Sequence, residues 1–188
     1  MQLCRRCATI ESMGEMDDHL RALVDAAREG DNVAVRELVR HTQPVIWRLC
    51  NVLGSPGEED DLVQDTYLRA FRSLPTYRGD APITAWLLSI ARRVCADHVR
   101  GRVRARRVVD ALSESADERW EAAPGNPTFE LLGAIDPDRR EAFVLTQVAG
   151  LSYDEAALVL DCPVGTIRSR VARARADLVA EVNAAEAS

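Results

Sequence analysis

The segment GLSYDEAALVLDCPVGTIRSRVARAR, residues 150–175, decides the fold of the second half of the chain. Ser152 followed three residues later by Glu155 is a capping box, which predicts that a short helix begins there. Asp-Cys-Pro at 161–163 predicts a turn, because proline suits the first turn of a following helix. Helix, turn and second helix together predict a helix-turn-helix over 152–175.

The second helix of this segment combines an apolar face with a basic face. Four apolar residues at helical spacing predict a stripe that faces the core: Ile167, Val171, Ala174 and Leu178. Four Arg and no acidic residue occur between positions 166 and 176. Small residues beside these Arg favour close approach to DNA, as in a recognition helix, although a solvated basic face is the alternative. By helical geometry Arg173 points away from the stripe, whereas Arg170 lies nearer the edge of the core. The predicted DNA-binding residues are Thr166, Arg168, Ser169, Arg170 and Arg173.

The composition of the whole chain is that of a globular protein. The 188 residues carry a net charge of −6, with 47% hydrophobic and 29% charged residues, which excludes a largely disordered chain. No stretch reaches the roughly 18 apolar residues of a membrane span, and the first residues lack the apolar core of a signal peptide. We therefore expect a cytoplasmic protein that does not contact a membrane.

The charges are segregated along the sequence. Residues 92–107 contain seven Arg and a single Asp, a local charge of +6. The stretch that follows is acidic and rich in Ser, Ala, Pro and Gly, which is typical of a linker. An acidic total therefore does not exclude binding to nucleic acid.

Helical periodicity dominates the chain, and few runs are typical of strands. We predict an all-α fold of two small helical domains joined by a flexible acidic linker. The predicted limits are a disordered leader over 1–16, a first domain over 17–107, a linker over 108–126, a helix-turn-helix domain over 127–183 and a tail over 184–188. Within the first domain, Asp31 is a candidate helix cap, and Pro44 should end or kink the second helix or open a new one.

The five Cys are odd in number and do not indicate a disulfide framework. Cys4 and Cys7 form an isolated CxxC pair without the further ligands that a metal site needs, so we expect no metal and no cofactor. Met13 and Met16 are alternative starts, because helical periodicity begins only at about Asp17.

Longer motifs resemble a known family. Three segments of the first half resemble region 2 of extracytoplasmic-function (ECF, group 4) bacterial sigma factors of the sigma-70 family: DDLVQDTYLRAF (60–71), YRGD (77–80) and TAWLLSIARRVCADHVR (84–100). Two segments of the second half resemble region 4.2 of the same family: GLSYDEAA (150–157) and PVGTIRSRVARAR (163–175). They occur in family order and at family spacing, and CPVGTIRSR is similar to the actinobacterial sigma-C subgroup.

This resemblance implies a region 2 helical bundle and a region 4 helix-turn-helix in a subunit of RNA polymerase that is not itself an enzyme. It implies that one set of residues docks on the β′ coiled coil of core RNA polymerase: Asp60, Asp61, Gln64 and Asp65. Such an exposed acidic surface suits an Arg-rich partner helix. Region 4 is implied to contact the β flap.

The resemblance also implies that region 2 binds the single-stranded −10 promoter element, while region 4 reads the −35 duplex. The implied −10 residues are Tyr77, Arg78, Arg92, Arg93, Asp97 and Arg100. Tyr77 would offer a stacking face, Arg78 would reach a phosphate, and Trp86 is expected in the core. Arg93 stands where many relatives have Asn, which puts its role in base discrimination in doubt. Promoter DNA and core polymerase are the implied partners of a chain that is monomeric when free, and an anti-sigma factor is a further candidate.

Two alternatives remain open. A helix-turn-helix repressor would bind duplex DNA without polymerase, as a dimer on a palindrome, but the sequence lacks a dimerising apolar seam. An enzyme would have to use His19, His41 or His98, yet these have neither metal-ligand spacing nor a paired nucleophile.

Overall fold

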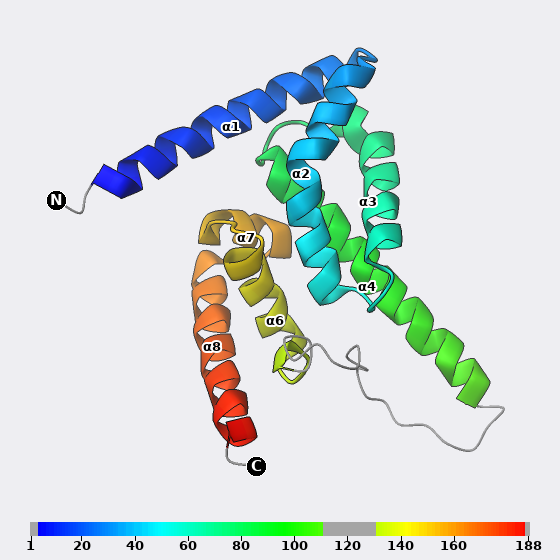
Figure 1. Ribbon diagram of the computed structural model, residues 1–188, viewed down its shortest axis with the longest axis vertical. Coiled ribbons are helices and arrows are strands. Elements are labelled where there is room, and N and C mark those ends of the chain that lie inside the picture. The colour runs from blue at the N-terminus through cyan, green and yellow to red at the C-terminus, as the bar shows by residue number, and fades with distance from the viewer. Residues whose placement is uncertain (1–3, 111–130, 187–188) are drawn as a thin grey trace.

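The computed structural model describes residues 4–110 and 131–186, and every regular element within these ranges is helical, which confirms the all-α prediction. The first domain consists of α1 (Cys4–Arg28), α2 (Asn32–Leu53), α3 (Glu59–Ser73), a 3-10 turn (Leu74–Thr76) and α4 (Ile83–Asp110) (Figure 1). The second domain contains α6 (Pro137–Phe143), a π-helical segment (Val144–Val148), α7 (Tyr153–Leu160) and α8 (Val164–Glu186).

Helix α1 begins well before the expected helix start. The sequence predicts a disordered leader over 1–16, whereas α1 is helical from Cys4. Half of residues 1–16 are Arg, Glu, Met or Ala, which are strong helix formers, and no proline interrupts them. Figure 1 shows the first turns of α1 projecting beyond the other helices of the domain.

The connection from α1 to α2 confirms the predicted cap. The Asp31 carboxylate accepts hydrogen bonds from the backbone N–H groups of Val33 at 2.7 Å and Ala34 at 3.3 Å. Helix α2 then continues through Pro44, so no new helix opens there. Pro44 is exposed, and the carbonyl that loses its helical partner to the proline belongs to exposed Arg40, so water can solvate it.

Helices α2, α3 and α4 pack around a core of Leu, Ile and Val. Ile46 and Leu49 of α2 and Leu88 of α4 are fully buried in it. One polar contact crosses this core, where the hydroxyl oxygens of Thr42 and Tyr67 lie 2.7 Å apart. Burial raises the pKa of Tyr67 to about 12, so this hydroxyl stays neutral at physiological pH.

Gly54 allows α3 to lie close to the end of α2. A Cβ at this position would be 2.3 Å from Cδ1 of Leu62 and 2.4 Å from the carbonyl oxygen of Cys50. The backbone N–H of Gly54 donates to that carbonyl at 2.8 Å, which holds the end of α2 in place. A side chain would displace both contacts, so glycine fits the position better than any larger residue.

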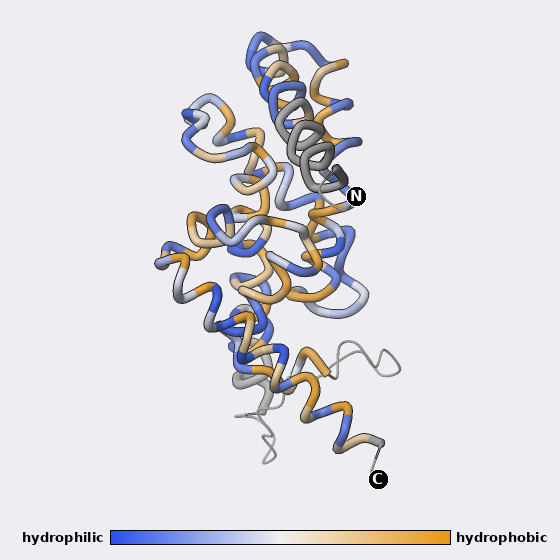
Figure 2. Tube along the Cα trace, turned by 90° about the vertical axis from the view of Figure 1, so that its left-hand side faces the viewer, coloured by the Kyte–Doolittle hydropathy of each residue, from blue (hydrophilic) through white to orange (hydrophobic). Residues whose placement is uncertain are grey.

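The second domain is built around α8, which packs along α6. The predicted stripe is confirmed, since Ile167, Val171 and Ala174 are buried and Leu178 is partly buried against the same core. Hydrophobic and hydrophilic residues alternate along the helix that leads to the C-terminus, as Figure 2 shows. This alternation leaves one side of α8 polar.

The predicted domain limits differ from the helix ends at two places. Helix α4 runs to Asp110, so the predicted linker over 108–126 begins inside it, and residues 111–126 of that linker lie outside the described residues. Helix α8 runs to Glu186, into the predicted tail.

The two domains pack against each other. Helix α7 packs on α4, and the π-helical segment packs on α2 (Figure 1). Buried apolar residues of both domains belong to one continuous cluster. An ion pair between Arg92 of α4 and Glu141 of α6 also spans the interface, with 3.1 Å between Nη1 and Oε2.

Candidate nucleic-acid interface

Helices α7 and α8 form the predicted helix-turn-helix. The capping box is present, since Ser152 Oγ accepts from the Glu155 N–H at 3.2 Å and the Glu155 carboxylate accepts from the Ser152 N–H at 2.7 Å. Asp161 ends α7 in the left-handed conformation, with φ of 49°, and the Cys162 N–H donates to the carbonyl of Ala157 at 3.1 Å. This turn fixes the direction in which α8 leaves α7.

The polar side of α8 carries most of the predicted −35 residues. Arg168, Ser169 and Arg173 are exposed, and neither Arg has an ion-pair partner in the part of the chain that the structure describes. Thr166 is half-buried, and its backbone carbonyl accepts the Ser169 hydroxyl at 2.9 Å. The two guanidinium groups are therefore available to a polyanion.

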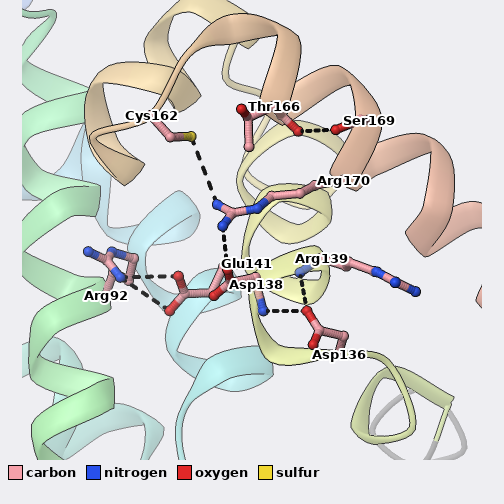
Figure 3. A network of polar contacts seen from close by, with 9 residues as sticks. All are labelled: Arg92, Asp136, Asp138, Arg139, Glu141, Cys162, Thr166, Ser169 and Arg170. Carbon is pink, nitrogen blue, oxygen red and sulfur yellow. Dashed lines mark hydrogen bonds and ion pairs between the residues drawn. The ribbon is translucent and has the colours of Figure 1, made fainter.

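Arg170 points away from this exposed side (Figure 3). Its guanidinium forms an ion pair with Asp138 of α6, and its Nη1 lies 3.9 Å from the sulfur of Cys162. The side chain is only 25% exposed. In this structure the Arg170 side chain ties the recognition helix to α6, and its contact with DNA stays a prediction. Its helical position near the edge of the core was the sequence signal for this role.

The start of α3 presents the acidic surface that the sequence predicts. Asp60, Asp61 and Gln64 are exposed. Asp65 is less accessible, and it forms an ion pair with Arg69, with 2.8 Å between Oδ2 and Nη2. Neither Asp60 nor Asp61 forms an ion pair within the described residues, so both carboxylates are open to a partner.

The loop before α4 differs from its prediction at Tyr77. This residue is 8% exposed, its hydroxyl donates to the carbonyl of Ala81 at 2.5 Å, and its ring centroid lies 5.0 Å from that of Trp86. The guanidinium of Arg28 lies 5.7 Å from the ring centroid. The ring is thus enclosed in the free chain, and its stacking on a DNA base stays a prediction, whereas Arg78 in the same loop is exposed. Trp86 packs partly buried against the core, as expected.

Arg92 faces the second domain, not the solvent (Figure 3). Its Nη1 lies 3.3 Å and 3.1 Å from the two carboxylate oxygens of Glu141, and the side chain is 26% exposed. In this arrangement Glu141 binds the Arg92 guanidinium, and the contact of Arg92 with DNA stays a prediction. Its neighbour Arg93 is exposed.

Further along α4, Asp97 and Arg100 are joined. Oδ1 of Asp97 accepts from Nη2 of Arg100 at 2.6 Å, and Oδ2 accepts from Nη1 of Arg69 at 2.8 Å. The guanidinium groups of Arg69 and Arg100 hold the pKa of Asp97 below its usual range. Arg69 was not among the residues predicted from the sequence. The only signal for it was its position four residues after Asp65, where an i, i+4 ion pair is expected on a helix.

Comparisons with known proteins agree with this geometry. The family model described as Sigma-70 region 2 matches residues 38–105, and the one described as Sigma-70, region 4 matches residues 129–178. The ECF RNA polymerase sigma factor SigC of Mycobacterium tuberculosis is 41% identical over 173 residues, which cover 88% of this chain and 92% of that protein. The ECF RNA polymerase sigma-E factor of Escherichia coli K12 is 32% identical over 171 residues, which cover 82% of this chain and 90% of that protein.

The chain belongs to the family of ECF RNA polymerase sigma factors. This confirms the sigma-factor resemblance and the organisation into regions 2 and 4. The helix-turn-helix of α7 and α8 begins within the region 4 match and is the DNA-binding motif of this sigma factor, which acts in transcription initiation.

Two solved structures share the fold. CnrH in complex with the cytosolic domain of CnrY has a TM-score of 0.71 and 32% identity, and covers 88% of this sigma factor and 98% of that chain. RpoE from Bartonella quintana in complex with the anti-sigma factor NepR has a TM-score of 0.61 and 28% identity, and covers 77% of this sigma factor and 93% of that chain.

The three His of this sigma factor lie in two separate places. The rings of His19 and His41 are in contact, with centroids 5.4 Å apart, whereas His98 pairs with the carboxylate of Glu58 at the start of α3. Arg102 lies 3.4 Å from the same Glu58.

Over residues 4–110 and 131–186 no cluster of three or more His, Cys, Asp or Glu is placed to bind a metal ion. None of the described helices combines the length and apolar character that crossing a membrane requires.

Proposed function

We propose that this sigma factor binds core RNA polymerase, reads the −35 promoter element as duplex DNA through α8, holds the −10 element as a single strand on region 2, and so promotes melting. It acts in the cytoplasm as a polymerase subunit and catalyses no reaction of its own. The observation that carries the proposal is the polar side of α8, where Arg168 and Arg173 are exposed without a counter-ion in the described ranges while Ile167 and Ala174 anchor the helix. Arginine in this arrangement suits guanine edges and phosphates in a major groove.

The proposed −10 surface consists of the Arg side chains of region 2 that are exposed. Arg78 precedes α4, and Arg93 and Arg100 share one side of α4 at helical spacing. Guanidinium groups there can contact the phosphates of a single strand and stack on its bases. Because the surface binds the open strand, it shifts the equilibrium between paired and melted DNA toward the melted state.

The acidic start of α3 is proposed to bind the β′ coiled coil of the polymerase, and region 4 to bind the β flap. Asp60, Asp61 and Gln64 are exposed on one helix, and their charge complements a basic partner helix. Since the structures of CnrH and RpoE contain bound partner proteins, we also propose that an anti-sigma factor binds this chain.

Transcription of a fragmented genome tests the proposal. The purified full-length chain is added to core polymerase from the source organism, and the 5′ ends of the transcripts are sequenced. We expect new start sites that share two upstream elements and disappear when the chain is omitted. Absence of such starts, together with tight binding of the free chain to a palindromic duplex, would favour the repressor alternative.

Substitutions of two Arg of α8 distinguish a loss of DNA affinity from a loss of stability of the fold. Arg173→Ala is expected to weaken binding of the holoenzyme to the −35 duplex and to reduce the slope of log affinity against log salt by about one, with thermal stability unchanged. Arg170→Ala removes the ion pair with Asp138, and we expect it to lower the free energy of unfolding by up to about 1 kcal/mol. Fluorescence anisotropy and thermal denaturation measure the two effects. An unchanged salt slope for Arg173→Ala argues against the assignment of the exposed side.

A further inference from the structure

An alternating chain of charges joins α3 to α4. Asp65 pairs with Arg69 at 2.8 Å, Arg69 pairs with Asp97 at 2.8 Å, and Asp97 pairs with Arg100 at 2.6 Å. The guanidinium of Arg69 is the middle of this series of ion pairs. Its Nη2 contacts Asp65 of α3, and its Nη1 contacts Asp97 of α4. It therefore lies between the acidic surface of α3 and the proposed −10 surface of α4.

These ion pairs contribute little to the stability of the fold. The side chains of Arg69, Asp97 and Arg100 are 42%, 48% and 64% exposed, and ion pairs at such exposure are weak because water and salt screen them. The main consequence of these ion pairs is that they change the net charge on the exposed side of α4. Asp97 stands between Arg93 and Arg100 on the side of α4 that has to meet a phosphate chain, and both of its oxygens are covered by guanidinium groups.

We propose that Arg69 is a positioning residue for the −10 surface, acting through Asp97. It neutralises the Asp97 carboxylate from α3, so that Arg93 and Arg100 meet the DNA without a repelling negative charge between them. Arg100 keeps donors for phosphate, because a guanidinium has five N–H groups and Nη2 is the nitrogen bound to Asp97. This inference rests on the proposed function of the α4 surface.

A double-mutant cycle tests the role of Arg69. The four proteins are wild type, Arg69→Gln, Asp97→Asn and the double variant, each assembled with core polymerase. The probe is a short single-stranded oligonucleotide that the wild-type holoenzyme has selected from a random pool. We expect Arg69→Gln to weaken binding by about fivefold, because the Asp97 carboxylate then keeps only Arg100 as a partner, and a like charge near a phosphate costs roughly that much in water. The same substitution made in the Asp97→Asn background should change affinity little, because the charge to be neutralised is gone.

Two further variants complete the design. Arg72→Gln removes the same charge from the same helix, and Arg72 is exposed without an ion pair in the ranges 4–110 and 131–186, so we expect little change in binding. Arg69→Lys keeps the charge and should retain most of the wild-type affinity. Equal losses from Arg69→Gln with and without Asp97→Asn would overturn the inference, since Arg69 would then contact DNA itself or act on the fold. If the wild-type holoenzyme selects no single strand, the proposed function fails instead.

Discussion

Asp61→Arg is expected to lower the affinity of the chain for core RNA polymerase by about 100-fold, because a like-charge contact at an interface costs several kcal/mol. Asp61 lies in the first turn of α3, is exposed, and has no ion-pair partner in the described part of the chain. Its carboxylate is thus available to a basic helix of the polymerase, and an Arg in its place would repel that helix. Association measured by surface-immobilised core polymerase gives the affinity directly.

The control for this substitution is Glu29→Arg. Glu29 is exposed in the connection between α1 and α2, so the variant makes the same change of net charge away from the start of α3. Placing Arg at the start of a helix also opposes the helix dipole, at a cost of about 0.3–1 kcal/mol. Circular dichroism should therefore show a folded Asp61→Arg protein with a slightly lower melting temperature. Comparable affinities of the two variants would rule out α3 as the docking surface.

Local patterns in the sequence were sufficient to predict the helix-turn-helix and the cap of α2. The capping box of Ser152 and Glu155, the buried stripe through Ile167 and the cap at Asp31 depend on residues within one or two helical turns, and all three are present. Such patterns succeed because backbone hydrogen bonds and helical spacing fix them without reference to the rest of the chain.

The sequence does not show which side chains are held by partners that lie far away in the sequence. Arg170 is bound by Asp138 of α6, and the ring of Tyr77 is covered by Arg28 of α1. Helical periodicity indicates which side of a helix a residue occupies, but not which neighbouring helix meets that side. An Arg near the edge of a buried stripe can therefore reach a carboxylate of the next helix and still be counted as exposed from the sequence.

The partner of Arg92 also could not be predicted from helical periodicity, because it lies in the other domain. This partner affects whether Arg92 can contact DNA. In the sequence it belongs to the basic stretch over 92–107, which favours DNA binding. In the structure its partner is Glu141, 49 residues later in the second domain. Glu141 thus occupies the guanidinium that the sequence predicts for DNA, and we expect separation of the two domains to release it.

Glu141→Arg is expected to shift the two domains from packed to separated. Two guanidinium groups would face each other in a place where both side chains are only about one quarter exposed. Breaking a buried ion pair costs up to 3–5 kcal/mol, so about 2 kcal/mol is reasonable at this exposure and corresponds to roughly a 30-fold change in the ratio of the two states. Small-angle X-ray scattering should show a larger radius of gyration, and the free chain should bind the selected single strand more tightly.

The interface already contains a feature that favours separation. The Nε atom of Arg92 is buried and has no hydrogen-bond partner among residues 4–110 and 131–186, and such an atom costs about 1–3 kcal/mol that solvent exposure would recover. Apolar contact between α7 and α4 opposes this, so the balance between the two states is sensitive to the ion pair. Glu181→Arg, at an exposed position near the end of α8, makes the same change of charge and should leave the scattering unchanged.

The exchange of both charges separates the effect on packing from the effect on DNA. The double variant Arg92→Glu with Glu141→Arg restores an ion pair across the interface, so its radius of gyration should return toward that of the wild type. It carries a carboxylate on α4 in place of the guanidinium, so its affinity for the single strand should fall below that of Glu141→Arg. A double variant that stays expanded would mean that apolar packing or backbone strain, and not this ion pair, decides whether the domains stay together.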